Sequence, residues 1–370
     1  MADLKVEILG MKFKNPVMPA AGPNVWDGDR MILAAKNGAG GIVAKTVSVI
    51  PAKVPHPNIA KTVAGGLLNA ELWSEEPWEK FVATEYKKAK STGLPLIASV
   101  GYGKDDLAKL GPEIAKTGYV DAIEFSIHYL GKDITPVVES AKALKQGTNL
   151  PVIAKISPNV PDIAELVKAI DPYIDALVAV NSLGPALDFD PEDVTPFLDS
   201  ENGFGWMSGK AIMPLALRCV YEIRQVFNKP IFGVGGIETG EDAIKFMMAG
   251  ASAVQICSIV IKEGHKAYGR IAQEMSDWLD KHGYDSVNDV KDLYFNKMQK
   301  KKTIRYNVVV PELIDEKKCI SCGKCEKSCM HGAITMTQSE NGKIPVYDEA
   351  ICLGCGYCTT VCPVKVLKIK

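Results

Sequence analysis

The sequence predicts an α/β protein in which a (β/α)8 barrel is followed by a small, cysteine-rich α+β domain. Three observations lead to this prediction. Short apolar runs alternate with amphipathic stretches from residue 16 to about residue 283, as expected for repeated βα units around a parallel sheet. Eight such runs over about 270 residues match the usual size of a TIM barrel. Eight of the ten cysteines lie after this region, in the last 52 residues.

The eight expected strands are short apolar runs separated by helical patterns. The strands are residues 17–21, 41–46, 95–100, 122–126, 152–156, 176–180, 231–234 and 253–256. The helical patterns, mostly bounded by Gly, Pro or Asp, include residues 78–90, 107–116, 136–144, 163–170, 213–227 and 243–248. A doubly wound sheet is the alternative fold, and the count of eight strands favours the barrel.

Two connections, residues 47–77 and 183–211, are longer than the others. Barrel active sites are built from the segments that follow the carboxyl ends of strands, so we expect both connections to form walls of the site. The resulting domain plan places the barrel in residues 1–283, a connector in residues 284–315 and the second domain in residues 316–370.

The cysteines of the second domain form two copies of the pattern C-x2-C-x2-C-x3-C. This spacing is typical of a bacterial-type ferredoxin with two [4Fe-4S] clusters, in which the fourth cysteine of each run binds the other cluster. A zinc site or a disulfide framework is the alternative, and the third cysteine of each run favours clusters. One cluster is expected to bind Cys319, Cys322, Cys325 and Cys362, and the other to bind Cys329, Cys352, Cys355 and Cys358.

The charge balance favours a small-molecule enzyme. With 43 basic and 44 acidic residues, the net charge is −1, which gives no electrostatic reason to expect binding to nucleic acid or to an anionic membrane.

No apolar run approaches the roughly 18 residues of a spanning helix, and the first residues contain no signal-peptide apolar region. We therefore expect a cytoplasmic protein.

A phosphate-binding sequence occurs at the end of the expected barrel. Gly235 and Gly236 follow the seventh strand, and Cys257 and Ser258 follow the eighth. The loops after these two strands are the usual phosphate site of a barrel, although the two glycines could instead form only a tight turn. Iron–sulfur clusters carry single electrons and organic chemistry needs pairs, so the expected phosphate ligand is the converter FMN. No early Gly-x-Gly-x-x-Gly sequence supports direct binding of NAD.

Two lysines end expected strands at the catalytic rim, Lys45 after the second and Lys155 after the fifth. Both follow apolar strand residues, which favours a position inside the barrel over one on the surface. A cation at this position can stabilise negative charge on a reduced flavin ring.

These residues occur in an order that resembles the dihydroorotate and dihydropyrimidine dehydrogenase family of FMN barrels. The resemblance extends from about residue 15 to residue 363, and it is closest to the half of dihydropyrimidine dehydrogenase in which a barrel precedes a paired-cluster module. It implies that the flavin ring and ribityl chain contact Ala20, Ala21, Gly22, Lys45, Thr46 and Lys155. It also implies that the phosphate end is held by Ser208, Gly209, Gly235, Gly236, Cys257 and Ser258.

The resemblance further implies that the substrate ring is hydrogen-bonded by Asn69, Glu71, Asn181 and Ser182. The chain departs from the family after the fourth strand, where relatives carry Asn-Leu-Ser-Cys-Pro with an acid cysteine. In an alignment without gaps, the substrate asparagine becomes Ser126 and the cysteine becomes Tyr129, with His128 beside it. Because both Tyr and His can act as a general acid, we expect the proton donor to be His128 or Tyr129.

The expected activity is that of an oxidoreductase acting on CH–CH groups. It transfers a hydride between flavin N5 and an activated double bond of a small planar substrate, and two [4Fe-4S] clusters relay electrons from a ferredoxin or an NAD-linked flavoprotein. One alternative is a dihydropyrimidine or dihydroorotate dehydrogenase subunit with an altered acid residue. A second alternative is an electron-transfer subunit without catalysis. The resemblance also implies a homodimer.

Overall fold

The computed structural model describes residues 1–126, 131–301 and 303–369, and the chain divides into two compact units. The units are Met1–Lys300 and Lys301–Lys370. The division falls inside the range that we expected to connect the domains, because part of that range forms the helix α11 (Leu293–Lys300). This helix packs on α8 (Gly240–Ala249) of the first unit.

Eight parallel strands form the centre of the first unit, in the spatial order β3-β16-β15-β10-β9-β8-β7-β4. The two outermost strands of this order, β3 and β4, also contact each other, so the sheet is a nearly closed barrel. The (β/α)8 class predicted from the sequence is confirmed. The strands are β3 (Val17–Pro19), β4 (Ile42–Val43), β7 (Leu96–Val100), β8 (Ala122–Ser126), β9 (Val152–Ile156), β10 (Ala176–Ala179), β15 (Ile231–Val234) and β16 (Ala253–Ile256).

Every residue of these eight strands is buried. A parallel sheet that is covered on both faces requires nearly continuous apolar runs, which explains why the strands were recognisable in the sequence. Each run lies within one of the eight predicted ranges. The structure ends three of the strands one to three residues earlier than predicted, and the residues that follow, such as Lys45 and Thr46, belong to the catalytic rim.

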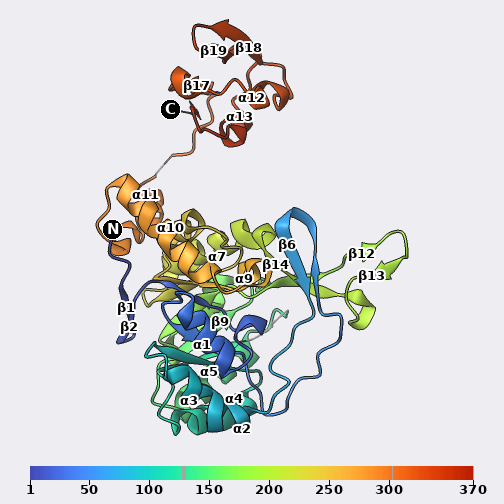
Figure 1. Ribbon diagram of the computed structural model, residues 1–370, viewed down its shortest axis with the longest axis vertical. Helices are drawn as coiled ribbons and strands as arrows, with labels where there is room; N and C mark the ends of the chain where they lie inside the picture. Colours follow the sequence, from blue (N-terminus) through green and yellow to red (C-terminus); the bar gives the residue numbers. More distant parts are fainter. Residues whose placement is uncertain (127–130, 302, 370) are drawn as a thin grey trace. The chain divides into compact units, whose positions relative to one another are not determined.

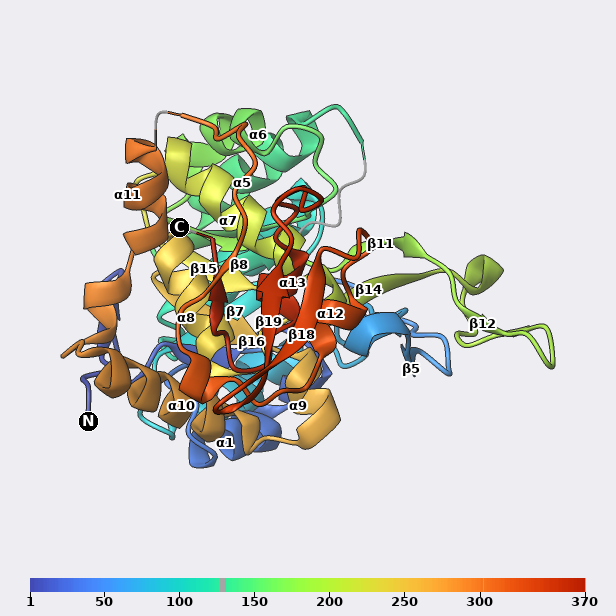
Figure 2. The same cartoon turned by 90° about the horizontal axis from the view of Figure 1, so that it is seen from above.

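Helices cover the outside of the barrel. Helix α7 packs on β15 and α8 packs on β16, and Figure 2 shows both helices outside these strands. The helix predicted at residues 78–90 is continuous but contains a π-helical turn, η3 (Phe81–Glu85). The other helices of the layer are α1 (Gly28–Lys36), α2 (Trp78–Lys80), α3 (Tyr86–Lys90), α4 (Lys104–Ala115), α5 (Thr135–Gly147), α6 (Ile163–Ile170), α7 (Met213–Val226), α9 (Ser258–Glu263) and α10 (Ala267–His282).

The two long connections pair with each other in a four-stranded antiparallel sheet of order β11-β14-β6-β5. Its strands are β5 (Ile59–Lys61), β6 (Gly66–Asn69), β11 (Leu183–Ala186) and β14 (Gly205–Gly209). Figures 1 and 2 show a hairpin beyond this sheet that projects away from the barrel, formed by β12 (Phe189–Asp190) and β13 (Thr195–Pro196). A separate hairpin at the start of the chain pairs β1 (Val6–Ile8) with β2 (Met11–Phe13).

The second unit is small and of mixed class, as predicted. Two short helices, α12 and α13, contact each other, and each contains the third cysteine of one run in a buried position. A long hairpin joins β18 to β19, and β17 pairs with β20. The elements are β17 (Glu312–Leu313), α12 (Lys324–Lys327), β18 (Ile334–Ser339), β19 (Gly342–Tyr347), α13 (Tyr357–Val361) and β20 (Leu367–Lys368).

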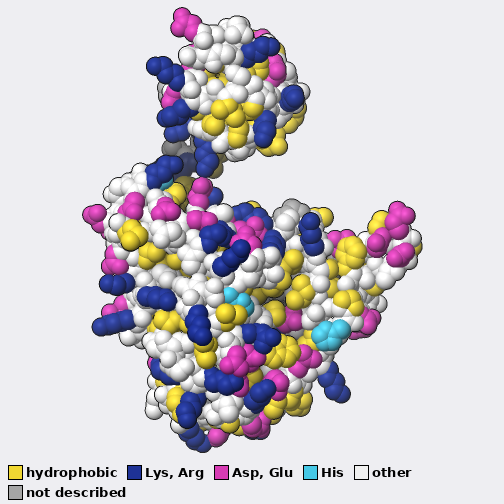
Figure 3. Space-filling model, viewed as in Figure 1, with side chains coloured by type: hydrophobic (Ala, Val, Ile, Leu, Met, Phe, Trp, Pro, Cys, Tyr) yellow, Lys and Arg dark blue, Asp and Glu magenta, His cyan; other side chains and the backbone are white. Residues whose placement is uncertain are grey.

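Surface charge on the barrel unit is mixed. Figure 3 shows basic and acidic side chains interspersed over the face of the barrel that it presents. Among the described residues, no helix combines the length and the apolar character that crossing a membrane requires.

Candidate functional site

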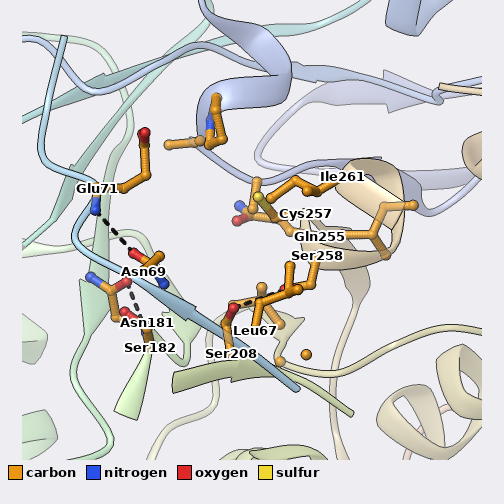
Figure 4. Close-up of a pocket in the computed structure, with 18 of the residues that line it drawn as sticks. Leu67, Asn69, Glu71, Asn181, Ser182, Ser208, Gln255, Cys257, Ser258 and Ile261 are labelled. Carbon is orange, nitrogen blue, oxygen red and sulfur yellow. Dashed lines mark hydrogen bonds between the residues drawn. The ribbon is translucent and has the colours of Figure 1, made fainter. Parts of the chain in front are cut away.

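A cavity of about 1050 Å³, its open mouth included, lies between the carboxyl ends of the barrel strands and the four-stranded sheet (Figure 4). The five residues predicted to bind substrate and the twelve predicted to bind FMN all line it. The predicted proton donors, His128 and Tyr129, lie outside the described residues.

One end of the cavity is a cradle of glycines. Gly235 and Gly236 have φ angles of 129° and 74°, in the region that favours glycine. A Cβ at Gly235 would lie 2.7 Å from Ala216 Cβ, and one at Gly236 would lie 2.6 Å from the carbonyl oxygen of Gly209. The loops therefore meet so closely that only backbone fits between them, as a phosphate approached by N–H groups requires.

Two serine side chains meet at the same end of the cavity. The Ser258 hydroxyl donates to Ser208 Oγ at 3.0 Å, which joins the end of β16 to β14 (Figure 4). Hydroxyls are suitable donors to a phosphate oxygen. Ser208, Ser258 and the glycine cradle together fit the phosphate end of FMN.

Asp242 holds two of these loops together. Its carboxylate lies 2.5 Å from Lys210 Nζ, which follows β14, and accepts the backbone N–H groups of Glu238 and Thr239 at 3.1 Å. Burial alone would raise the pKa of Asp242, but these hydrogen bonds, led by that from Lys210, outweigh it and lower the pKa. The carboxylate also forms the capping box of α8 with Thr239.

The two predicted lysines have different environments. Lys45 Nζ lies 2.6 Å from Glu71 Oε2 and donates to the carbonyl oxygen of Leu72 at 2.8 Å. Lys155 is only 6% exposed and lines the cavity, and its ammonium group has neither an ion pair nor a hydrogen bond within the described part of the chain. A buried cation without an anion is unfavourable, so the ammonium group of Lys155 fits a cavity that binds an anionic ligand. The reduced flavin ring is such a ligand.

The amide side chains of Asn69 and Asn181 face the cavity on the side away from Ser208 and Ser258 (Figure 4). Asn69 Nδ2 donates to the carbonyl oxygen of Trp206 at 2.8 Å, and Asn69 Oδ1 accepts the N–H of Glu71 at 3.3 Å. Asn181 Nδ2 donates to Ser126 Oγ at 3.1 Å, and its Oδ1 accepts the N–H of Ser182 at 3.0 Å. These hydrogen bonds give the Asn69 and Asn181 amides a fixed orientation at the cavity wall.

Cys257 is partly shielded at the other wall. Its thiol donates to Asn24 Oδ1 at 3.2 Å, and a Cβ at Gly22 would lie 2.7 Å from its sulfur. Burial raises the pKa of the Cys257 thiol to about 11, although the nearby Lys155 and Lys45 act in the opposite direction. The side chain is therefore a neutral thiol at neutral pH.

Three polar residues of the cavity were not identified as site residues from the sequence, Tyr102, Glu238 and Gln255. Tyr102 follows the third barrel strand, and its ring centroid lies 4.9 Å from that of Trp73. Gln255 Nε2 donates to Glu124 Oε2 at 2.9 Å in the barrel interior. A polar residue at the end of a predicted strand, the signal used for Lys45, also marks Tyr102 and Gln255.

In the second unit, two separate cavities surround the cysteines. One is lined by Cys319, Cys322, Cys325 and Cys362, and the other by Cys329, Cys352, Cys355 and Cys358. These are the two ligand sets expected from the crossing of the fourth cysteines. The fold thus brings each set of four thiols around one space, which fits a [4Fe-4S] cluster.

Comparison with known proteins identifies the family. The dihydroorotate dehydrogenase family pattern matches residues 3–279, and a 4Fe-4S dicluster domain pattern matches residues 318–366. The chain belongs to the dihydroorotate dehydrogenase family. The chain is thus an oxidoreductase of CH–CH groups with FMN in its barrel and two [4Fe-4S] clusters in its second unit, as expected from the sequence.

Relatives within the dihydroorotate dehydrogenase family match the barrel or the whole chain. The dihydroorotate dehydrogenase B (NAD(+)) catalytic subunit of Pyrococcus furiosus is 34% identical over 300 residues, which cover 78% of this chain and 97% of the relative. That of Methanocaldococcus jannaschii is 36% identical over 294 residues, with 75% and 93% covered. The NAD-dependent dihydropyrimidine dehydrogenase subunit PreA of Escherichia coli K12 is 29% identical over 392 aligned positions, with 99% and 95% covered.

Proposed function

We propose that this enzyme transfers a hydride between its flavin and an activated C=C or CH–CH bond of a neutral, planar cyclic amide. The observation that carries the proposal is the pairing of Glu71 with Lys45 in the wall that holds the oriented amides. The similarity to PreA along nearly the whole chain, including the cluster domain, supports a ring of the dihydropyrimidine kind.

When bound, FMN supplies the hydride chemistry and exchanges single electrons with the clusters. The glycine cradle, Ser208 and Ser258 would hold its phosphate. Lys155 would place positive charge beside the ring, where it stabilises the electron-rich reduced form.

The substrate wall favours a neutral ring over a carboxylate. A cyclic amide alternates N–H donors with C=O acceptors, and the oriented amide of Asn69 carries both kinds of group. Lys45 would be the cation of this wall available to a substrate carboxylate, but it is already paired with Glu71 at 2.6 Å, and Asn58 Nδ2 holds the other Glu71 oxygen at 2.6 Å. A substrate carboxylate would therefore find no unpaired cation in this wall.

We propose His128 or Tyr129 as the proton donor, because both follow Ser126, which lines the cavity. The variants H128F and Y129F separate the two possibilities. Loss of turnover in only one of them, with FMN and iron content unchanged, assigns the donor. Full activity of both variants would contradict the assignment.

Electrons would come from a separate ferredoxin or NAD-linked flavoprotein, since the chain has no dinucleotide fingerprint of its own. The description of PreA as a subunit of an NAD-dependent enzyme supports this arrangement. A homodimer in the cytoplasm is part of the same proposal. Size-exclusion chromatography with light scattering measures the oligomeric state.

The test is an anaerobic reoxidation assay. The purified enzyme is reduced with dithionite, excess reductant is removed, and the recovery of flavin absorbance is followed after addition of uracil, thymine, orotate or an open-chain unsaturated acid. We expect the neutral rings to reoxidise the flavin faster than orotate does. Faster reoxidation by orotate would contradict the neutral-ring proposal, and no reoxidation by any compound would favour the non-catalytic electron-transfer subunit.

A further inference from the structure

The two cluster cavities are covered by opposite ends of one face of the β18–β19 hairpin. In its register Ile334 is opposite Tyr347, and Met336 is opposite Pro345. Residues opposite each other, or two apart on one strand, point to the same face, so all four side chains share a face. Met336 and Pro345 line the cavity of the first cysteine set, whereas Ile334 and Tyr347 line that of the second.

Among the described residues, the hairpin donates a hydrogen bond to a sulfur of the second cysteine set and to none of the first. Tyr347 OH donates to Cys358 Sγ at 3.5 Å. In the other set, Met336 Sδ lies 3.9 Å from Cys325 Sγ, and the donor in that contact is the cysteine thiol. A cysteine that binds iron is a thiolate and has no proton, and a thioether has none to give. Once the clusters are bound, Cys358 keeps its donor from the hairpin, and Cys325 receives none from Met336.

The other described side chains of the first cavity are mainly apolar, namely Ile320, Val364, Val366 and Leu367, with Lys324 as the charged member. Lys324 is exposed to solvent, where its charge is screened. The second cavity is also largely apolar, with Pro311, Ala333 and Leu353 beside His331. The difference between the two cavities therefore rests on the hydroxyl that the hairpin supplies.

We propose that the two clusters differ in reduction potential and that Tyr347 makes the cluster of Cys329, Cys352, Cys355 and Cys358 the more easily reduced one. A hydrogen bond to a ligand sulfur stabilises the reduced cluster, which carries one more negative charge. In the half-reduced module, one electron leaves the first cluster and enters the second, and no other reactant is needed. Tyr347 thus tunes an iron–sulfur centre and does not touch the substrate.

The experiment is a redox titration of the anaerobically purified full chain, followed by electron paramagnetic resonance. The wild type is compared with Y347F, which removes the hydroxyl and keeps the ring. M336L is the matched control, because it replaces the corresponding side chain over the other cluster. Iron and sulfide content are measured for each protein.

We expect two separate midpoint potentials in the wild type. In Y347F the higher midpoint potential should fall toward the lower one. We expect a fall of about 59 mV, which for one electron is a tenfold change in the equilibrium constant for electron transfer between the two clusters. M336L should leave the higher potential unchanged. A single shared potential in the wild type would overturn the proposal even if Y347F fails to bind clusters. A shift of the lower potential, or of neither, in fully loaded Y347F would overturn it as well.

Discussion

At the scale of single residues, the contrast between Lys45 and Lys155 is the most informative feature of the cavity. Both lysines are buried at the rim of the barrel, but among the described residues an anion, Glu71, pairs with Lys45 and none pairs with Lys155. Since unpaired buried charge is unfavourable, the environment of Lys155 is complete only with a ligand in place. The two lysines therefore have different roles: Lys45 belongs to the substrate wall, and Lys155 lies beside the flavin.

Replacing Lys155 by methionine should lower turnover by about 100-fold or more, because a charge that stabilises the reduced ring is lost from a site shielded from water. The flavin midpoint potential should also become more negative, which an anaerobic dye-linked titration measures. Lys168 is exposed on α6, and K168M is the matched control that should behave as the wild type. A K155M enzyme with unchanged turnover and potential would contradict the assignment of Lys155 to the flavin.

The pKa of Cys257, raised by burial to about 11, predicts a specific pH dependence. Alkylation requires the thiolate, whose fraction rises about tenfold per pH unit below the pKa. Modification by iodoacetamide should therefore be slow at neutral pH and should still be accelerating at pH 9. Mass spectrometry of the peptide that contains Cys257 isolates this thiol from the others. A rate that levels off below pH 9 would show that the thiol is not shielded as described.

At the scale of elements, the cradle depends on the close meeting of three loops. G236A should reduce the FMN content of the purified protein, because the new Cβ would lie 2.6 Å from the Gly209 oxygen at a φ of 74°. Overpacking of this kind costs about 1–3 kcal/mol. Gly93 is the matched control, since its φ is 73° and no atom lies within 4 Å of a Cβ placed there. G93A thus has the same backbone strain without the clash, and equal FMN loss in both variants would contradict the cradle.

The barrel strands could be predicted from the sequence because each is a short run that is buried on both sides. The four-stranded sheet could not be predicted, because its pairing joins distant segments. Asn69 on β6 bonds to Trp206 on β14 across 137 positions of the chain, and β11 is only half buried. Neither the length of the connections nor their composition contains that register.

Much of the site could also be predicted, since the carboxyl ends of the barrel strands lie at one rim regardless of the conformation of the loops. The hydrogen-bond partners of the site residues could not be predicted from the sequence. The pairing of Lys45 with Glu71 depends on the path of residues 47–77 after the second strand, and it changes the expected charge of the substrate. The donor from Tyr347 to Cys358 depends on the register of a hairpin, which periodicity does not give.

At the scale of the whole molecule, the two units have different sources of stability. The barrel unit has a large apolar core formed by its strands and helices. In the described part of the second unit, the buried hydrophobic cluster consists of Cys325, Ile334, Cys358 and Leu367, so half of this cluster is made of expected iron–sulfur ligands. A domain of this size rarely folds on such a core alone, and bound metal supplies the remainder.

Removing iron with a chelator under anaerobic, reducing conditions should unfold the second unit and leave the barrel folded. Hydrogen exchange should lose protection within residues 318–366 while β8 and β9 keep theirs, and FMN should remain bound. The eight cysteines replaced in pairs provide a control without chelator. Equal loss of protection in both units would show that the barrel depends on the clusters as well.

Because cysteines form half of that small core, the activity of the enzyme depends on the supply of iron and sulfide during its synthesis. A copy that acquires FMN before its clusters would have a complete flavin site and an unfolded iron–sulfur domain. Electrons from the partner protein would then meet no cluster and could not be relayed to the flavin. Starvation for iron would therefore leave the barrel folded and loaded with FMN, but without turnover.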